Sequence, residues 1–311
     1  MSRVIVIGGT GFIGRHLSKR LMEKGYEVVC MTRNVSRAKE EAEGRINIQF
    51  VGWDGRSAVG WGGYAEGAAA VINLAGENLA SGRWDKKRKQ RIIQSRLQAG
   101  KAVLDAVKSA RRKPGVVIQA SAVGFYGNRG DEVLDEASGP GSGFLVEVVR
   151  EWEGSTAEIE ALGVRRVVIR TGLVLGPKEG ALSRLVLPFR FFLGGPLGGG
   201  RQWVSWIHIQ DEVQAILYLM EHPELKGIFN LTSPYPLQNR DFSQKMGAVL
   251  KRPSWMPAPG FLLRVLYGKM AEETILSGQR VMPARLSEAG FEFAFPDAEM
   301  ALTDILGKKS R

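Results

Sequence analysis

Apolar runs alternate with amphipathic segments along the first 170 residues. The runs are short and continuous, as in buried strands of a parallel sheet, and they predict strands at 3–7, 27–32, 46–51, 70–74, 116–120 and 164–170. The segments between them are apolar on one side and predict helices at 12–24, 34–43, 85–112 and 144–162. Strands that alternate with helices indicate βαβ units. We therefore predict an α/β fold, a doubly wound parallel sheet with helices on both faces.

A G-x-x-G-x-x-G motif stands between the first predicted strand and the first predicted helix. It comprises Gly8, Gly9, Thr10, Gly11, Phe12, Ile13 and Gly14. The chain must turn sharply there, let its backbone approach a pyrophosphate and pack helix on strand, and each task favours a residue without Cβ. The start of the helix also offers unpaired N–H groups to phosphates. The motif in this context predicts a Rossmann-type dinucleotide site.

The end of the second predicted strand discriminates between two cofactors. Sites for NAD(H) usually place Asp or Glu there to bind the ribose 2′-hydroxyl. This chain has Thr32, Arg33 and Asn34 instead, with Arg37 one turn later. A guanidinium forms a planar fork that suits a 2′-phosphate, and it stacks on adenine. Arg33 therefore predicts a preference for NADP(H) over NAD(H), the competing interpretation being a surface arginine at a helix start.

The pattern changes beyond residue 233. Predicted helices become shorter, and prolines cluster at Pro253, Pro257 and Pro259. We predict an NAD(P)-binding Rossmann domain over residues 1–233, with substrate-lobe insertions at about 178–206, and a small C-terminal substrate or lid lobe over 234–311. The glycine-rich stretch 194–200 is too short to link independent domains and predicts a loop near a pocket.

Further motifs extend along nearly the whole chain. They are NLAG at 73–76, SAVGFYG at 121–127, IRTGLVLGP at 169–177 and WVSWIH at 203–208. With the glycine motif they make the chain resemble the extended short-chain dehydrogenases/reductases. The closer match is an atypical, YfcH-like branch of NAD-dependent epimerases/dehydratases, the "epimerase family proteins". Residues from about 257 to 306 resemble the small domain of unknown function that ends these proteins. The resemblance implies a nicotinamide cofactor and an oxidoreductase or epimerase reaction on a small molecule that the sequence does not name.

The chain departs from the superfamily at the catalytic positions that the resemblance implies. Ser121 matches the serine at the end of the fifth strand. The next helix should carry Tyr-x-x-x-Lys, but it contains neither residue. If Glu153 matches the acid that often follows the pair, the two positions hold Leu145 and Val149, which transfer no proton. Candidate acids by residue type alone are Tyr126, Glu147, Arg150 and His208.

We take Ser121 and Tyr126 as the candidate catalytic residues. Two other interpretations stay open. One is hydride transfer with a different proton route, and the other is an NADP(H)-binding sensor or scaffold without catalysis.

The resemblance also implies cofactor contacts outside the glycine motif. The loop after the fourth predicted strand should face the cofactor through Leu74, Ala75, Gly76 and Glu77. Arg83 follows and offers a cation to phosphate, unless it is simply solvated. Asp54 stands where extended members often touch adenine, unless it only closes a turn. His208 is expected to be a packed histidine with its polar atoms satisfied.

The chain is basic, with 43 Lys and Arg against 32 Asp and Glu and a formal net charge of +11. The densest run is Lys86, Lys87, Arg88 and Lys89 with Arg91, which we interpret as a solvated helix face. It has no accompanying nucleic-acid-binding motif, so a nucleic-acid partner is not expected. A phosphate-rich cofactor explains only a small part of the excess charge.

Cysteine content and hydropathy predict the protein's surroundings. Cys30 is the only cysteine, which excludes an intrachain disulfide and fits a reducing compartment. The sequence has no apolar run of the ~18 residues that a membrane span needs, and no Cys/His cluster with metal-ligand spacing. We expect a cytoplasmic protein with no membrane partner and no metal. Extended relatives often dimerise through helices like those at 85–112 and 144–162, which leaves a homodimer open.

Overall fold

The computed structural model describes residues 2–41, 48–79, 82–177 and 179–307. Seven parallel strands form the central sheet, in the order β11-β7-β5-β4-β1-β2-β3. They are β1 (Arg3–Ile7), β2 (Glu27–Thr32), β3 (Ile48–Gly52), β4 (Ala70–Asn73), β5 (Val116–Ala122), β7 (Arg165–Thr171) and β11 (Gly227–Leu231). The strand order reverses between β1 and β4, and open α/β sheets bind ligands at such a switch point. The predicted doubly wound Rossmann sheet is confirmed.

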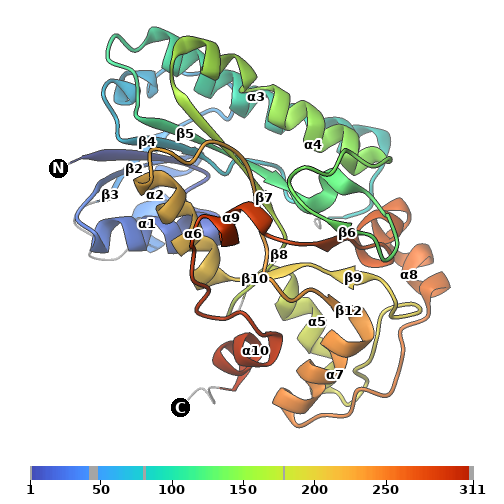
Figure 1. Ribbon diagram of the computed structural model, residues 1–311. Coiled ribbons are helices and arrows are strands. Elements are labelled where there is room, and N and C mark those ends of the chain that lie inside the picture. Colours follow the sequence, from blue (N-terminus) through green and yellow to red (C-terminus); the bar gives the residue numbers. More distant parts are fainter. Residues whose placement is uncertain (1, 42–47, 80–81, 178, 308–311) are drawn as a thin grey trace.

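Helices cover both faces of this sheet (Figure 1). On one side lie α1 (Phe12–Glu23), α2 (Val35–Glu41) and α6 (Ile209–Glu221), and on the other α3 (Lys86–Ser109) and α4 (Phe144–Gly154). Alternate residues of β1 serve the two sides. Val4 and Val6 pack in one apolar cluster with Leu17 of α1, whereas Ile5 and Ile7 pack in another with Val103 of α3. All four strand side chains are fully buried, which explains why this strand is an unbroken apolar run.

The helix predicted at 144–162 is interrupted. α4 ends at Gly154, and residues Ala157–Leu162 form a separate 3-10 helix, η3. Gly154 and Ser155 are poor helix formers, and the Ser155 hydroxyl donates to the Trp152 carbonyl at 2.6 Å. The helix predicted at 85–112 is continuous as α3, because the Asp85 side chain caps its start and accepts from Arg88 N. The predicted helix 34–43 and strand 46–51 both extend into residues 42–47, outside the described part of the chain.

A lobe of shorter elements lies beside the carboxyl ends of the strands (Figure 1). Its strands are β8 (Leu173–Leu175), β9 (Trp203–Val204), β10 (Trp206–His208) and β12 (Leu237–Gln238); its helices are α5 (Gly180–Arg190), α7 (Asn239–Leu250), α8 (Gly260–Tyr267), η4 (Ala271–Ile275) and α10 (Ala298–Leu306). Trp206 is fully buried in the lobe's core with Val186 of α5, Phe242 of α7 and Leu302 of α10. One core thus joins segments from both sides of residue 234.

Five small elements complete the described chain. They are η1 (Gly62–Ala65), η2 (Val123–Tyr126), β6 (Val133–Leu134) and β13 (Arg280–Val281), with α9 (Ala284–Glu288) after β13. β13 pairs with β6 in parallel, and the Arg285 guanidinium of α9 donates to the Ile228 carbonyl of β11 at 2.6 Å. The chain therefore returns from the lobe to the edge of the sheet before it enters α10. Within the described residues, no helix is long and apolar enough to cross a membrane.

Candidate functional site

The glycine loop makes a close turn between β1 and α1. Gly8 has φ +82°, where glycine is favoured, and Gly11 N donates to Gly8 O at 3.0 Å. A Cβ added to Gly14 would lie 2.2 Å from Gly8 O, so helix and loop touch backbone to backbone. Gly11 is the N-cap of α1, and neither a side-chain cap nor an acidic residue in the first turn neutralises the helix start. The positive end of the helix dipole is available to an anion.

The neighbours of this loop come from both halves of the molecule. Phe12 packs under Gly176, where an added Cβ would lie 2.5 Å from its ring. Arg15 donates to the Thr10 carbonyl at 2.7 Å and forms an ion pair with Glu179, just before α5. Ile13 packs against the apolar cluster that contains Val4, Val6 and Leu17. Thr10, Phe12 and Ile13 thus fix the loop against the sheet and the lobe.

At the end of β2, one exposed cation replaces the acid that NAD(H) sites usually carry. Thr32 is buried, and its hydroxyl accepts from Asn34 N at 3.2 Å. Asn34 in turn starts α2 by accepting from Arg37 N at 3.0 Å. Arg33 is exposed, and its guanidinium makes no hydrogen bond or ion pair with the residues that the structure describes. An exposed guanidinium without such partners can bind an anionic ligand.

Asp54 closes a surface turn after β3. Its carboxylate accepts from Ser57 N at 3.0 Å, from Arg56 N at 2.7 Å and from the Ser57 hydroxyl at 3.1 Å. The backbone hydrogen bonds from Ser57 and Arg56 lower the pKa of this exposed carboxyl below its usual value. The side chain is thus already engaged in the turn.

The loop after β4 lies directly against the glycine loop. A Cβ added to Gly8 would lie 3.0 Å from the Leu74 carbonyl carbon, and one added to Gly76 would lie 3.1 Å from the guanidinium of Arg96. Ala75 N donates to the Asn73 side chain at 3.2 Å, which holds the loop at the strand end. The structure therefore brings Leu74 and Ala75 beside Gly8.

Two buried arginines of α3 form hydrogen bonds with the loop after β4. Arg88 donates to Glu77 Oε1 at 2.5 Å and to the Asn78 carbonyl. Arg96 donates to the carbonyl of Glu77 at 3.3 Å, and burial lowers its pKa to about 10. The interpretation of the basic run as a wholly solvated face was wrong for Arg88, which is only 6% exposed, and for Lys89, whose ammonium lies 4.3 Å from the Phe144 ring centre. The packing of α3 against the loop decides this.

Arg83 contacts the lobe. Its guanidinium donates to the Val265 carbonyl of α8 at 3.1 Å, while the side chain stays exposed. This bond links the loop after β4 to the small helix that covers the lobe's edge.

The end of β5 contains a buried network of polar groups. The Ser121 hydroxyl donates to Glu153 Oε1 at 2.5 Å, and Arg170 holds the same carboxylate with two bonds of 2.8 and 3.0 Å. Arg170 also donates to the Tyr126 hydroxyl at 3.1 Å, which donates to Asn230 Oδ1 at 2.7 Å. Burial alone would lower the pKa of Arg170, but the bonds and charge of Glu153 outweigh burial and raise it.

This network leaves the two candidate hydroxyls little room for a substrate. Ser121 is 4% exposed and Tyr126 is fully buried, with a pKa that burial raises. The Glu153–Arg170 pair was not predicted from the sequence. The sequence shows only a Glu on a predicted helix and an Arg at the end of a predicted buried strand. The fold alone brings these two residues together.

Apolar side chains occupy the helix face where the superfamily carries its proton donors. An added Cβ on Gly124 of η2 would lie 3.7 Å from Leu145 and 3.9 Å from Val149. Leu145 N donates to Glu273 Oε2 of η4 at 2.9 Å, so the lobe supplies a carboxylate to the start of α4. The alternative acids Glu147 and Arg150 are exposed on the same helix.

His208 and Glu212 lie where the lobe joins α6. His208 is 1% exposed and caps α6, because its Nδ1 accepts from Gln210 N at 3.1 Å. Burial lowers its pKa to about 4, although Asp304 acts in the opposite direction. The histidine is packed, as expected, but the expectation that both its polar atoms are satisfied was wrong, because the buried Nε2 has no hydrogen-bond partner among the described residues and lies 3.5 Å from Asp304 Oδ2. Glu212 is fully buried and accepts from the Thr171 hydroxyl at 2.9 Å. Burial raises its pKa to about 8.

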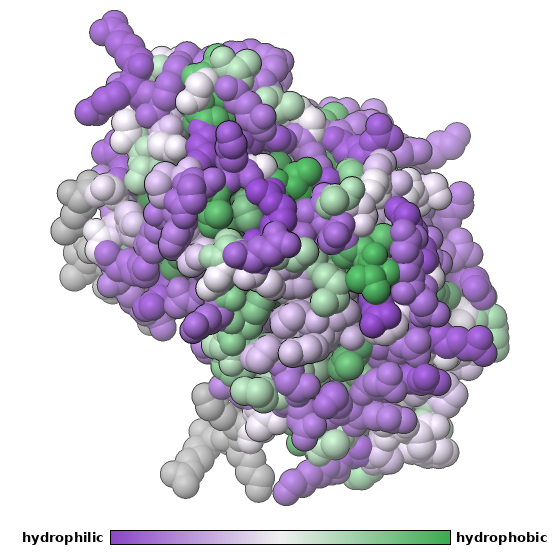
Figure 2. All heavy atoms as spheres, viewed as in Figure 1, coloured by the Kyte–Doolittle hydropathy of each residue, from purple (hydrophilic) through white to green (hydrophobic). Residues whose placement is uncertain are grey.

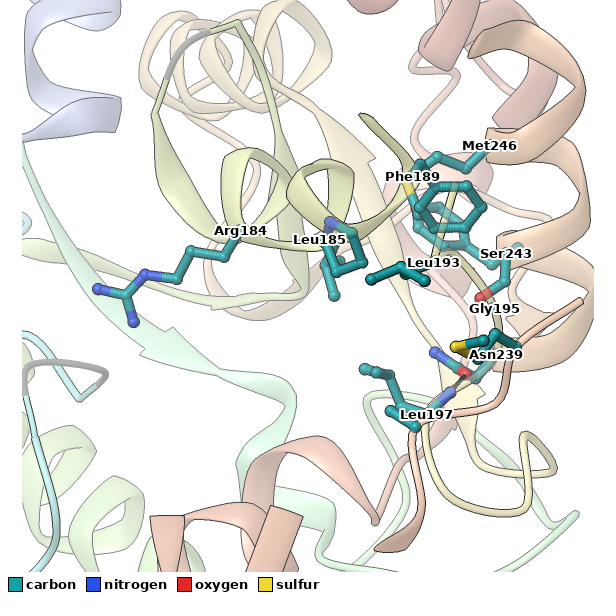
Figure 3. A pocket seen from close by; sticks show the side chains of 13 residues that line it. Arg184, Leu185, Phe189, Leu193, Gly195, Leu197, Asn239, Ser243 and Met246 are labelled. Atoms are coloured by element: carbon teal, nitrogen blue, oxygen red, sulfur yellow. Dashed lines mark hydrogen bonds between the residues drawn. The ribbon is translucent and has the colours of Figure 1, made fainter. Parts of the chain in front are cut away.

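A small apolar pocket of about 80 Å³ lies inside the lobe between α5 and α7 (Figure 3). It is lined by Leu185 and Phe189 of α5, by Met246 of α7, and by Leu193 and Leu197 from the loop after α5; in Figure 3 Phe189 lies beside Met246. In Figure 3 the Arg184 side chain points away from these apolar groups. Asn239 is at the rim, where its Oδ1 accepts from Leu197 N at 2.7 Å.

Comparison with known proteins identifies the family. Residues 4–232 match the model of the NAD dependent epimerase/dehydratase family, and residues 258–305 match DUF1731, a domain of unknown function. The chain belongs to the NAD dependent epimerase/dehydratase family. The family and the C-terminal domain that the sequence motifs indicated are thus confirmed.

Several relatives cover nearly the whole chain. The chloroplastic epimerase family protein SDR39U1 homolog of Arabidopsis thaliana is 39% identical, over 97% of this chain and 86% of its own length. The epimerase family protein YfhF of Bacillus subtilis is 36% identical, over 98% of both chains. The crystal structure of human epimerase family protein SDR39U1 with NADPH is 31% identical, covers 99% of this chain and 100% of its own, and has a TM-score of 0.87.

Proposed function

We propose that this protein binds NADP(H) at the carboxyl edge of its sheet and transfers hydride between the nicotinamide and a small-molecule substrate. The observation that carries the proposal is the open anion site at the start of α1, flanked by the exposed Arg33. The human relative whose structure contains NADPH shares the fold over the full length of this chain. When bound, the cofactor supplies or accepts hydride.

The glycine loop fits the pyrophosphate part of such a cofactor. The start of α1 has no side-chain cap, and no carboxylate in its first turn competes with an anion for its backbone N–H groups. The loop at 74–77 lies against Gly8 and would cover the cofactor from the β4 side. The Asp54 turn follows β3, next to β2, and would border the adenine.

Arg33 is the residue that we assign to the 2′-phosphate. It is exposed at the end of β2, and the neighbouring residues Thr32 and Asn34 bind only each other and α2. A guanidinium bound to a phosphate through charge-assisted hydrogen bonds contributes about 1.5–3 kcal/mol. This is enough to discriminate NADPH from NADH by roughly 10- to 100-fold.

Proton transfer in this site follows a different route from that of the superfamily. Leu145 and Val149 carry no proton, and Tyr126 is enclosed by Arg170 and Asn230. We assign Tyr126 and Arg170 to holding the end of β5 in place. The Ser121 hydroxyl already donates a hydrogen bond to Glu153, so toward a substrate its oxygen can only accept a hydrogen bond. A substrate hydroxyl would therefore be bound as a donor at this position.

The second candidate function is an NADP(H)-binding sensor without catalysis. The self-contained network around Glu153 favours it, because the residues that usually act on the substrate are replaced or already paired. Binding of the cofactor would then change the contact between the Rossmann sheet and the lobe, which the Arg15–Glu179 ion pair beside the glycine loop links.

The test is equilibrium binding of NADPH and NADH to the purified protein and to Arg33→Glu. We expect tighter binding of NADPH, weakened about 10- to 100-fold in the variant, with NADH affinity nearly unchanged. Lys226→Glu, an equal charge reversal on the far edge of the sheet, is the control and should leave both affinities unchanged. Equal affinity for the two cofactors would overturn the assignment of Arg33. Absence of binding would overturn the proposal itself.

Turnover separates the two candidates. The holoprotein is incubated with a panel of carbonyl compounds and nucleotide sugars, and NADPH oxidation is followed by absorbance. Oxidation with any member, lost in Gly14→Ala, supports the enzyme. Tight NADPH binding with no oxidation, and a partner recovered only when NADPH is present, supports the sensor.

A further inference from the structure

Two segments of the C-terminal half carry cations but no carboxylates. Residues 180–210 contain three Arg and no Asp or Glu, and residues 242–271 contain five Lys or Arg and no Asp or Glu. Together they hold eight positive charges, most of the formal net charge of +11. Much of the excess charge that the cofactor does not explain is therefore concentrated in these two segments.

The fold places parts of these segments side by side. Trp255 N and Met256 N both donate to the Gly194 carbonyl, at 3.1 and 3.0 Å, and the Trp255 indole donates to the Phe192 carbonyl at 3.1 Å. Gly198 N donates to the Ala258 carbonyl at 2.8 Å, just before α8 begins. We call the surface formed by residues 187–193 and 251–267 the lobe face.

The lobe face carries most of the exposed large apolar side chains. Of fifteen such side chains in the described part of the protein, eleven lie within 187–193 and 255–267. Phe191, Trp255, Phe261 and Val265 are each more than 60% exposed. The face drawn in Figure 2, which has α8 at its edge, is predominantly hydrophilic. A concentration of exposed apolar groups of this kind marks an interaction surface.

Phe192 has a backbone conformation that its side chain does not favour. Its φ is +61°, at the left-handed position after the end of α5, where glycine is preferred. Its ring is nevertheless half-exposed and lies under the Arg252 guanidinium, 4.4 Å from the ring centre. Packing among the described residues does not account for a Phe at this position. We infer that its ring contacts a binding partner.

The charges next to these rings have few partners within the protein. Arg190, Lys251 and Arg252 form no ion pair with any residue that the structure describes. The face thus combines aromatic and aliphatic groups with unpaired cations and lacks carboxylates, which is the composition of segments that bind at a lipid interface. Anionic headgroups attract such cations, and aromatic rings settle at the headgroup level.

We propose that the lobe face docks at the surface of an anionic phospholipid bilayer. The rings of Phe191, Phe192 and Trp255 enter the interface while Arg190, Lys251 and Arg252 contact headgroups. A symmetric contact between two copies would set these cations against each other, and a nucleic acid would leave the apolar side chains uncovered. Surface docking needs no spanning helix, so it adds a peripheral contact where the sequence analysis expected no membrane partner. The proposal is independent of cofactor binding.

The test is flotation of the full chain with vesicles of phosphatidylcholine, with or without phosphatidylserine. We expect binding to the vesicles that contain phosphatidylserine and little binding to phosphatidylcholine alone. Because the charges act at the surface, binding should fall strongly at about 0.5 M NaCl. No flotation with either vesicle at low salt would overturn the proposal.

Phe192→Gly is the decisive variant because it removes the ring and relieves the backbone strain. Its thermal stability should be equal to or above that of the wild type, while vesicle binding weakens. Phe191→Ser combined with Trp255→Ser should weaken binding about tenfold or more. Val59→Ser removes an apolar side chain that is 83% exposed outside the lobe face, and it should bind like the wild type. NADPH affinity should be unchanged in every variant and reports intact folding.

Charge-reversal variants provide a second test of the lipid proposal. Lys251→Glu should weaken binding to phosphatidylserine vesicles, whereas Lys226→Glu should not. Equal loss in both would mean that only net charge matters and would overturn the assignment to this face. Sedimentation of the free protein tests the rival occupant: a concentration-dependent dimer that Phe192→Gly abolishes would assign the face to a second copy and overturn the lipid proposal.

Discussion

The start of α1 and the end of β5 lie on the same edge of one sheet, but their polar groups are in opposite states. At α1 the helix start has no side-chain cap and no acid in its first turn, and the Arg33 guanidinium makes no hydrogen bond or ion pair with the described residues. At β5 every donor of the motif is already bound within the protein, because Ser121, Tyr126 and Arg170 are all tied to Glu153 or Asn230. An open site is satisfied by a ligand, whereas a closed network mainly stabilises the fold.

The difference explains why the cofactor is easier to assign than the reaction. Backbone N–H groups at a helix start and a cation without an ion pair indicate that the ligand of this site is an anion. A buried ion pair with satisfied hydrogen bonds implies nothing about a substrate.

Arg170→Gln should have the largest effect. It removes one partner of a buried pair and leaves Glu153 charged among apolar groups, which costs about 3–5 kcal/mol of unfolding free energy. Chemical denaturation measures this loss. The control is Arg264→Gln, whose pair with Glu272 is more than half exposed on both sides and should contribute less than about 1 kcal/mol. A loss of similar size in both variants would contradict the closed network.

Gly14→Ala should abolish NADPH binding and cost about 1–3 kcal/mol of stability, because its Cβ would meet Gly8 O at 2.2 Å. Titration calorimetry and thermal unfolding measure the two effects. Gly63→Ala is matched in chemistry, since nothing lies within 4 Å of the added Cβ, and it should be neutral for binding. Retained NADPH affinity in Gly14→Ala would show that the loop does not hold the cofactor.

Glu212→Gln should flatten the pH dependence of stability between pH 6.5 and 8. The folded pKa of Glu212 is raised to about 8 from 4.5, so the folded state keeps a proton that the unfolded state has lost. Stability therefore falls as pH rises from 4.5 to 8, by up to about 1.4 kcal/mol per pH unit. His208, with its folded pKa near 4 and a normal value of 6.5, acts in the opposite direction only below pH 6.5.

The measurement is denaturation of the wild type and Glu212→Gln at pH 6.5 and pH 8. We expect the variant to gain about 2 kcal/mol relative to the wild type across that interval. Parallel profiles for the two proteins would mean that Glu212 is ionised in the folded state.

Tyr126→Phe should have the smallest effect, about 1 kcal/mol, because one hydrogen bond to Asn230 and one from Arg170 are lost without a change in volume. NADPH affinity should not change. If a turnover assay is found, a loss of kcat without a loss of stability would restore Tyr126 as the catalytic acid.

Local pattern was sufficient for much of the fold. The β1–α1–β2 unit is recognisable because its strand is buried on both faces and its turn requires glycine, and both constraints act on neighbouring residues. The pattern failed where a distant contact decides. It extended α4 through Gly154, and it assigned Arg88 to solvent, although Glu77 and Asn78 bind it across the loop after β4.

For this protein, the sequence by itself determined the doubly wound sheet, the family and the position of the glycine loop, because each follows from residues close together in the chain. Only the tertiary structure decided that Ser121 and Tyr126 belong to one network with Glu153, Arg170 and Asn230, which come from three other places in the sequence. It also decided that the cations of two distant segments meet exposed aromatic rings on one face. Burial and pairing depend on which segments the fold brings together, and no local pattern records that.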